Sequence, residues 1–174
     1  MAGEIAFSPV GIAHTSASDE DVREMGKDLK YTIELFPEYT KALDGIDGFS
    51  HLIVLFYFDR LRPEQKGVLR VKPKKFLRRG LTLDELPWLG VFALDSPSRP
   101  NPIGFSIVEF VRHDGLRLEV RGLEAFDGTP VLDIKPCSPE RLVPAVKVPR
   151  WFSDLEGIAK KREPKRAESK KSVK

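Results

Sequence analysis

Two loop-forming segments carry the residue types from which a ligand site could be built. The first, Asp95 to Ser106, reads D-S-P-S-R-P-N-P-I-G-F-S, and its closely spaced prolines fix φ and remove backbone donors. We expect a stiff, extended loop whose carbonyls are left free and from which Arg99 and Asn101 project, with Gly104 permitting a close approach of backbone or ligand. A purely structural corner between two strands is the alternative, and both interpretations stay open.

The second segment, Asp127 to Pro136, reads D-G-T-P-V-L-D-I-K-P. Asp127 and Gly128 favour a turn, and the side-chain oxygens of Asp127 and Thr129 can cap it. One interpretation is a plain hairpin. The other is a loop whose backbone amides and carbonyls hold a small polar ligand.

Several common chemistries have no signal in this sequence. The P-loop, the G-x-G-x-x-G dinucleotide fingerprint and the G-x-S-x-G nucleophile elbow are all missing. The three histidines, His14, His51 and His113, are far apart and show none of the usual metal spacings. Cys137 has no paired histidine nearby, so neither a metal site nor a thiol nucleophile is predicted.

The charge of the chain is unevenly distributed. The net charge is +3 over 174 residues. Arg60 to Arg79 nevertheless holds nine Lys/Arg and one Glu, and Lys160 to Lys174 holds eight Lys/Arg and two Glu. The rest of the chain is therefore acidic. Such blocks indicate contact with a polyanion at defined places, or a solvated loop with a solubilising tail.

The composition places the chain in a broad class. With 41% hydrophobic and 32% charged residues, it can build a core. No stretch approaches the ~18 apolar residues of a membrane span, and the N-terminus does not look like a secretory signal. We expect a soluble cytoplasmic protein without a membrane segment.

The elements that position the two loops are mostly strands. Short apolar or alternating runs predict strands at residues 6–14, 31–36, 49–58, 68–72, 88–94, 105–112, 116–121 and 130–134. The most apolar run, 49–58, is expected to be buried on both faces. His113-Asp114-Gly115 predicts a hairpin, and Pro37 predicts a short helix over 38–43. The strongly charged stretch Asp19 to Lys30 is expected to be an exposed loop or a short helical turn.

Short strands without long intervening helices favour a mainly β fold. We predict a small β-barrel of about six or seven strands with one or two short helices. The barrel domain is expected to span residues 1–158. Residues 159–174 are predicted to be a disordered basic tail because apolar residues nearly vanish there.

These segments, with G-F-S-H-L-I-V-L-F-Y-F at Gly48 to Phe58, resemble a known family. It is the TsaA-like domain family, which includes the tRNA N6-threonylcarbamoyladenosine methyltransferase. Its pattern joins an aromatic-S-H-L strand, an R-P-N-P-I-G loop and a D-G-T-P-V-L-D-I-K-P segment in this order, and the resemblance runs from about Phe7 to Pro139. It implies a homodimeric β-barrel that binds S-adenosylmethionine and methylates N6 of the modified adenosine beside the tRNA anticodon. Exposed apolar residues near Trp88 and Phe92 are compatible with a dimer interface.

The resemblance also implies which residues contact the cofactor. The matching positions are Asp59, Arg60, Asp95, Phe105, Phe126, Asp127, Gly128 and Thr129, and the rigid loop between them is supported by Arg99, Pro100, Pro102 and Gly104. The chain departs from the family's pattern in several places. The N-terminal loop of the family often carries a P-R-Q-like cofactor contact, whereas this chain reads S-A-S-D-E-D-V-R-E-M-G there. Many members have Arg at the position of Asp95 and His-Gln at the positions of Asp59 and Arg60.

Methyl transfer requires positioning more than acid–base chemistry, and positioning alone can be worth ~7–11 kcal/mol. Asn101, or a carbonyl of its rigid loop, could orient the acceptor nitrogen. The anticodon loop is expected to lie on the basic stretch through Lys72, Lys74, Lys75, Arg78 and Arg79. Two alternatives stay open: a non-catalytic module that binds S-adenosylmethionine, and an RNA-binding protein without small-molecule chemistry.

Overall fold

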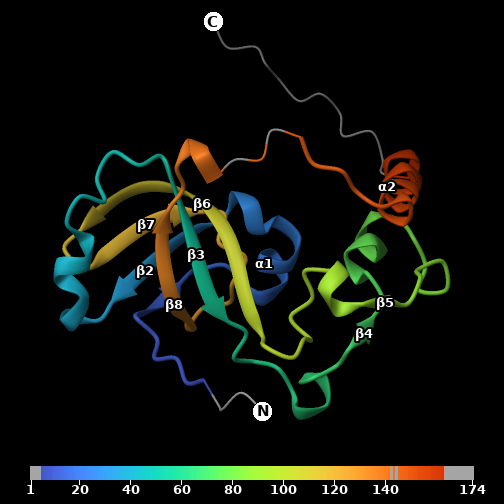
Figure 1. Ribbon diagram of the computed structural model, residues 1–174, viewed down its shortest axis with the longest axis horizontal. Coiled ribbons are helices and arrows are strands. Elements are labelled where there is room, and N and C mark those ends of the chain that lie inside the picture. The colour runs from blue at the N-terminus through green and yellow to red at the C-terminus, as the bar shows by residue number, and fades with distance from the viewer. Residues whose placement is uncertain (1–4, 142, 144, 163–174) are drawn as a thin grey trace, which may run out of the picture.

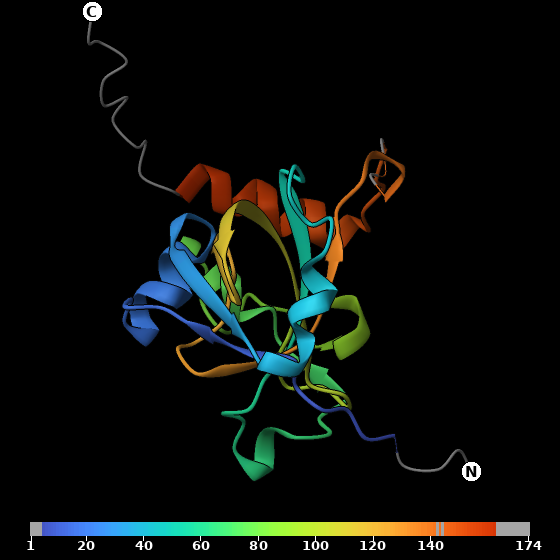
Figure 2. The ribbon, with the colours of Figure 1, turned by 90° about the vertical axis from the view of Figure 1, so that its left-hand side faces the viewer.

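The protein consists of a closed β-barrel and a smaller second lobe beside it (Figure 1). The structure is a computed structural model that describes residues 5–141, 143 and 145–162. Figure 1 shows the barrel on the left and the second lobe on the right. Figure 2 looks at the barrel from its far end, with the second lobe behind it.

Six antiparallel strands close the barrel, which confirms the predicted fold class. Around the barrel the order is β1-β2-β7-β6-β3-β8, and the last strand pairs with the first. The strands are β1 (Gly11–His14), β2 (Lys30–Leu35), β3 (His51–Tyr57), β6 (Ile103–Asp114), β7 (Arg117–Arg121) and β8 (Thr129–Pro136). Closure leaves no long unpaired edge, which suits a small all-β domain.

The core lies inside the barrel and follows the two-residue period of the strands. In β6, Gly104, Ser106 and Val108 face inward and are buried, whereas the residues between them are exposed. The apolar strand β3 is buried at three consecutive residues, 52–54, and only half-buried at Leu55. The prediction that β3 is buried on both faces is therefore correct only for the first half of the strand.

Turns and short helices join the strands. The predicted hairpin connects β6 to β7, with Gly115 in the left-handed region at φ 56°. The predicted helix after β2 is the 3-10 helix η2 (Pro37–Leu43). Between β1 and β2 lie α1 (Asp19–Met25) and η1 (Gly26–Asp28). Ser18 begins α1 with a capping box in which it exchanges hydrogen bonds with Asp21.

The second lobe is formed by the long connection between β3 and β6. A two-stranded sheet of its own, β4 (Arg70–Val71) paired with β5 (Leu89–Gly90), lies outside the barrel. Around it lie the 3-10 helices η3 (Pro63–Gln65), η4 (Lys74–Arg79) and η5 (Val91–Ala93). The strand predicted over 88–94 is therefore only two residues long, because the chain turns into η5 at Val91.

The helix α2 (Arg150–Arg162) returns from the barrel and completes the second lobe. After η6 (Pro139–Arg141), the chain crosses to the lobe, where α2 packs on η4. The shared core consists of Phe76, Leu81, Leu86, Leu155 and Ala159.

This helix corrects the predicted domain boundary at residue 158. Ala159 is fully buried and α2 continues to Arg162, so the tail does not begin at 159. The sequence prediction missed this because the buried face of α2 is narrow. The remaining part of the predicted tail, 163–174, lies outside the described residues. Within the described ranges, no helix combines the length and the apolar character needed to cross a membrane.

Candidate functional site

The connection from β7 to β8 forms a fixed turn at one end of the barrel. Gly128 has φ 82° and donates its N–H to the carbonyl of Ala13 at 2.8 Å. The N–H of Thr129 donates a hydrogen bond to the carbonyl of Phe126 at 3.1 Å. The turn predicted at Asp127 and Gly128 is therefore present, with the left-handed backbone that favours glycine.

Two further hydrogen bonds anchor this turn. The Asp127 carboxylate accepts the N–H of Thr15 at 3.0 Å and lies 3.4 Å from Nδ1 of His14. On the other side, the hydroxyl of Tyr31 donates to the carbonyl of Ala125 at 3.0 Å. Burial raises the pKa of Tyr31 to about 12, so this hydroxyl stays protonated and keeps donating.

Arg60 joins the turn to α1 and to the end of β3. Its guanidinium lies 3.2 Å from the Asp19 carboxylate and also donates to the carbonyl of Asp127. The same guanidinium lies 5.3 Å from the centroid of the Phe126 ring. A second cation, Arg23 of α1, lies 4.8 Å from that ring. We call Asp19, Arg23, Arg60, Phe126 and Asp127 the Arg60 cluster.

The Arg60 cluster offers one aromatic ring, two carboxylates and two guanidinium groups. The two negative and two positive charges balance. Asp19 also pairs with Arg23 at 3.9 Å. Phe126 is half-buried, while Arg60 and Asp127 are exposed. S-adenosylmethionine has an aromatic base, two cationic groups and a carboxylate, and cations are attracted to ring faces. The side chains present therefore fit this cofactor in kind.

The Pro-rich loop contacts the chain next to Arg60 through its backbone. The carbonyl of Pro102 accepts the N–H of Phe58 at 2.8 Å, and the carbonyl of Asn101 accepts the N–H of Ile103 at 2.7 Å. The carbonyls expected to be free are thus partly used by the protein itself. Arg99 makes only a long hydrogen bond, 3.5 Å, to the carbonyl of Leu94, and Asn101 is exposed.

Gly104 serves the core of the barrel. An added Cβ there would lie 2.2 Å from Cε2 of Phe56, whose ring is fully buried. The close approach predicted at Gly104 is therefore made by a core phenylalanine. This identifies the end of the Pro-rich loop as a packing corner, whereas its exposed part around Pro100 remains open to solvent.

The predicted cofactor residues do not all meet. Arg60, Phe126 and Asp127 are in direct contact, and Asp59, Gly128 and Thr129 are their chain neighbours. Phe105 points out of the barrel with 59% of its surface exposed. In the described part of the chain, no side-chain hydrogen bond or ion pair joins Asp95 or Phe105 to the Arg60 cluster.

The contribution of α1 to this cluster was not predicted from the sequence. Asp19 and Arg23 lie in a segment that we expected to be an exposed loop or a short helical turn. The available signal was Ser18 followed by three acidic residues, which is typical of a capped helix start. Hydrogen bonds from the Ser18 side chain and backbone hold the pKa of Asp21 below its usual value.

The predicted RNA-binding cations have several partners within the protein. Lys72 donates to the carbonyl of Leu83 at 2.8 Å, and Arg78 donates to the carbonyl of Arg23. Arg79 forms an ion pair with Glu156 of α2 at 2.7 Å, and Lys75 lies 4.8 Å from the Phe152 ring. Lys74 is exposed, and its side chain has no partner among the described residues. Most of this block therefore also stabilises the second lobe.

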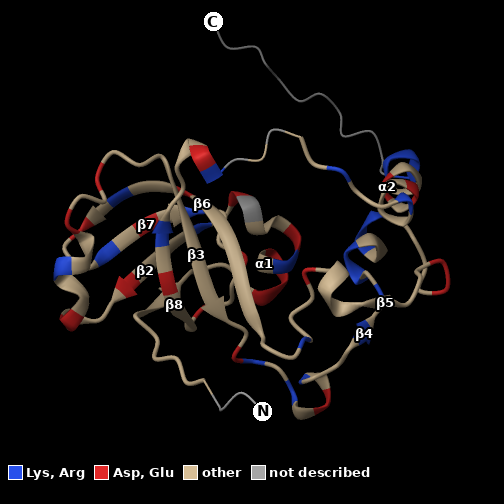
Figure 3. Cartoon of the chain, viewed as in Figure 1, with Lys and Arg blue, Asp and Glu red and all other residues tan. Residues whose placement is uncertain are grey.

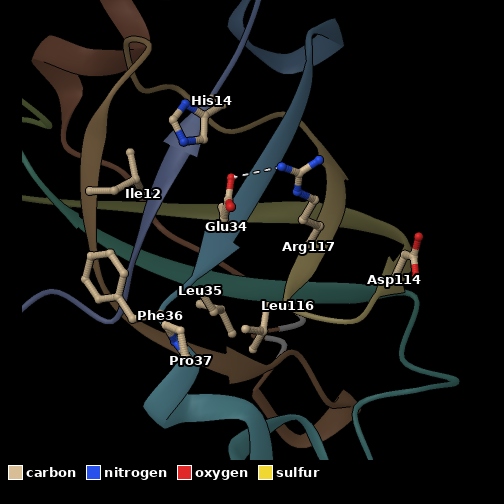
Figure 4. Close-up of a pocket in the computed structure, with 9 residues that line it drawn as sticks. All are labelled: Ile12, His14, Glu34, Leu35, Phe36, Pro37, Asp114, Leu116 and Arg117. Carbon is tan, nitrogen blue, oxygen red and sulfur yellow. Dashed lines mark hydrogen bonds and ion pairs between the residues drawn. The ribbon is translucent and has the colours of Figure 1, made fainter.

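Two shallow hollows lie on the barrel wall, away from most of the predicted site. One, of about 360 Å³, is bordered by β1, β2 and the β6–β7 turn. Figure 4 shows Glu34 and Arg117 paired across it, 3.5 Å apart, with His14 above them. A second hollow of about 530 Å³ is lined by His14, Thr15 and Tyr31, among others. His14 links both hollows to Asp127 of the Arg60 cluster, whose Arg60 and Asp127 side chains are exposed.

No metal centre is apparent in the part of the chain that the structure describes. There, no three His, Cys, Asp or Glu side chains are grouped so that they could hold an ion. His14 ends β1, His51 begins β3 and His113 lies beside the β6–β7 turn.

Comparison with known proteins identifies the class to which this barrel and its loops belong. Residues 22–142 match the tRNA-methyltransferase O N-terminal domain. The chain belongs to this family, which confirms the resemblance to the TsaA-like proteins.

Individual relatives support the same assignment. A Pyrococcus abyssi protein named "Probable S-adenosyl-L-methionine-binding protein" is 39% identical over 140 residues, which are 78% of this chain and 70% of that protein. An Archaeoglobus fulgidus protein of the same name is 47% identical over 106 residues, which are 61% of this chain but only 26% of the relative. The crystal structure of TrmO from Pseudomonas aeruginosa is similar with a TM-score of 0.64 and 29% identity. That similarity covers 83% of this chain and 61% of the TrmO chain.

Proposed function

We propose that this protein binds S-adenosylmethionine at the Arg60 cluster and transfers its methyl group to tRNA. The observation that carries the proposal is the contact of Arg60 with Phe126 and Asp127 in a member of the TrmO family. These residues come from connections that are distant in sequence. The acceptor that we propose is N6 of N6-threonylcarbamoyladenosine beside the anticodon.

Each member of the cluster has a role in this proposal. The Phe126 ring offers a face for the adenine base or for a cation. Asp19 and Asp127 can accept from amino and hydroxyl groups, and Arg23 and Arg60 can hold a carboxylate. Because Asp19 already pairs with both Arg23 and Arg60, ligand binding exchanges these internal ion pairs for ligand contacts. Asp95 and Phe105 are proposed to reach the ligand from the two ends of the Pro-rich loop.

The bound cofactor supplies an electrophilic methyl group attached to a sulfonium sulfur. The protein has to hold the acceptor nitrogen in line with that group, and Asn101 is our candidate positioning residue. Its amide oxygen is exposed on a loop stiffened by Pro100 and Pro102 and anchored at Phe58. A homodimer, expected from the family, could complete this open site with residues of the second copy.

Calorimetry with the cofactor tests the site directly. We expect Arg60→Ala to weaken S-adenosylmethionine binding about tenfold or more, because a hydrogen bond to a charged group is worth ~1.5–3 kcal/mol. Arg62→Ala is the matched control, since the Arg62 side chain is 72% exposed and forms its ion pair with the neighbouring Glu64. Equal affinities for the two variants would remove Arg60 from the cofactor site.

The turn itself offers a second test. Gly128→Val places a β-branched residue at φ 82°, where no neighbouring atom lies within 4 Å of the new Cβ. The change therefore strains the backbone without a clash. We expect loss of cofactor binding in a barrel that remains folded, as judged by circular dichroism.

Methyl transfer is tested by incubating tRNA with labelled cofactor and identifying the modified nucleoside by mass spectrometry. Label on the N6-threonylcarbamoyladenosine of tRNA is expected, and Asn101→Ala should lower the rate at saturating substrates. A wild-type rate in Asn101→Ala would refute the positioning role.

A second candidate function is a non-catalytic module that binds S-adenosylmethionine. It is favoured by the departures from the family's pattern at Asp59, Arg60 and Asp95, and by relatives named as binding proteins. Cofactor binding without any label in tRNA would select this function. RNA binding without cofactor binding would instead select an RNA-binding protein without small-molecule chemistry.

A further inference from the structure

The outer face of the small sheet in the second lobe exposes a tryptophan beside two cations. Arg70 of β4 pairs with Gly90 of β5, and Val71 pairs with Leu89. Because side chains alternate along a strand, Arg70 and Lys72 lie on the same face as Trp88 and Gly90. The opposite face continues to Val91, which is buried in the lobe.

Trp88 is a flat aromatic surface with free space next to it. It is 59% exposed, although the Nζ atom of Lys72 lies 5.7 Å from the ring centroid. Nothing lies within 4 Å of a Cβ placed on Gly90, the next residue on this face. Phe92, two residues further, is 82% exposed. Trp88 and Phe92 together expose apolar surface beside cations, which is typical of an interaction site.

The two cations are held in place at the ring. Lys72 donates to the carbonyl of Leu83 at 2.8 Å, and Arg70 donates to the carbonyl of Trp88 at 3.4 Å. Both charges are therefore oriented before any partner arrives. They belong to a stretch, 66–79, that has seven Lys/Arg and no Asp or Glu. Figure 3 shows this concentration of positive charge around β4, η4 and α2, in contrast to the mixed charges of the barrel.

We propose that the face formed by Arg70, Lys72, Trp88 and Gly90 binds an unpaired nucleobase of single-stranded RNA, with Trp88 stacking on the base. Aromatic rings flanked by cations are how proteins hold unpaired bases and the phosphates next to them. The inference rests on the proposed action on tRNA, whose anticodon loop supplies unpaired bases. A second copy of this chain is a poorer occupant, because a symmetric contact would bring two positively charged faces together.

Tryptophan fluorescence can observe this site selectively, because the chain has two tryptophans, Trp88 and Trp151. In Trp151→Phe, Trp88 is the sole reporter, and in Trp88→Phe it is Trp151. The probe is an oligoadenylate RNA of about ten nucleotides, within the usual site size of single-strand binders, compared with an RNA duplex of the same length. We expect the single strand to quench Trp88 strongly and Trp151 weakly, and the duplex to leave Trp88 nearly unchanged.

Affinity measurements separate stacking from charge. We expect Trp88→Ala to weaken binding of the single strand ~5- to 150-fold, the range for losing one stacked base, without changing the slope of log affinity against log salt. Trp88→Phe keeps a ring and should retain most of the affinity. Lys74→Ala, the charge control, should lower that slope by about 0.7.

Wild-type affinity in Trp88→Ala would overturn the proposal. So would equal quenching of Trp88 by the duplex, or a dimer that dissociates in Trp88→Ala while RNA affinity stays constant. The methylation assay keeps this question apart from the proposed function. Methylation by wild type with unchanged RNA affinity in Trp88→Ala refutes only the stacking site, whereas Trp88 quenching without methylation refutes only the enzyme.

Discussion

The barrel and the second lobe of this protein are stabilised in different ways. The barrel has a continuous ladder of backbone hydrogen bonds and fifteen buried residues in one cluster. The lobe has a two-residue ladder and five buried core residues, two of which come from α2 near the other end of the sequence. The core of the lobe therefore depends on the docking of α2, whereas the barrel distributes its stability over many strand pairings.

The ion pairs of the barrel and of the lobe also differ in what they connect. On the barrel, ion pairs such as Arg112 with Glu119 and Arg121 with Glu109 connect neighbouring strands. In the lobe, Arg79 with Glu156 and Arg162 with Glu85 connect the body of the lobe to α2. Basic residues that suit RNA binding thus also hold the lobe together, so their substitution tests both roles at once.

The largest effect that we expect is on the lobe core. Leu155→Ala should destabilise the lobe by about 2–5 kcal/mol, the usual cost of emptying a buried leucine site. Hydrogen exchange should show lost protection around Phe76 and Leu86 while β3 and β6 keep theirs. Ile158→Ala, at a site that is 36% exposed, is the control. Equal loss in barrel and lobe would show that the two unfold as one unit.

A substitution that overpacks the core should destabilise the barrel rather than the lobe. Gly104→Ala brings a Cβ to 2.2 Å from the buried Phe56 ring, so we expect about 1–3 kcal/mol of destabilisation. Urea denaturation followed by far-UV circular dichroism would measure it. A variant as stable as wild type would mean that Phe56 can move, contrary to its tight packing.

A substitution that favours helix formation in α2 should stabilise the lobe. Gly157 lies inside α2 with nothing within 4 Å of an added Cβ. Gly157→Ala should stabilise the helix by about 0.5–1 kcal/mol through its better helix propensity. Slower amide exchange in α2, without change in the barrel, is the expected result. Exchange that stays the same would indicate that α2 is not limiting for the lobe.

Lowering the pH should modestly reduce the stability of the lobe. The hydrogen bonds from Arg162 lower the pKa of Glu85 from 4.5 to about 2. A carboxylate with a depressed folded-state pKa contributes stability above its unfolded pKa and loses it as pH falls through the folded one. Between about pH 4.5 and 2, Trp151 fluorescence in the Trp88→Phe background should therefore report loosening of α2. Glu85→Gln should lack this dependence, and an identical pH profile in both proteins would contradict the assignment.

Local patterns in the sequence determined most of the barrel. The apolar run at 49–58, the hairpin at His113-Asp114-Gly115 and the turn at Asp127-Gly128 could be predicted because each depends on neighbouring residues alone. The R-P-N-P-I-G and D-G-T-P segments likewise indicated the family.

Only the tertiary structure decided which residues meet. Arg60 is 41 residues from Asp19 and 67 from Asp127, and closure of the barrel brings their connections together. Ala159 was expected to begin a disordered tail but is buried against η4, and Gly104 was expected to admit backbone or ligand but faces the Phe56 ring. A sequence pattern records local preference, whereas contacts over such separations depend on how the whole chain closes, because the same side chain can be solvated, paired or buried.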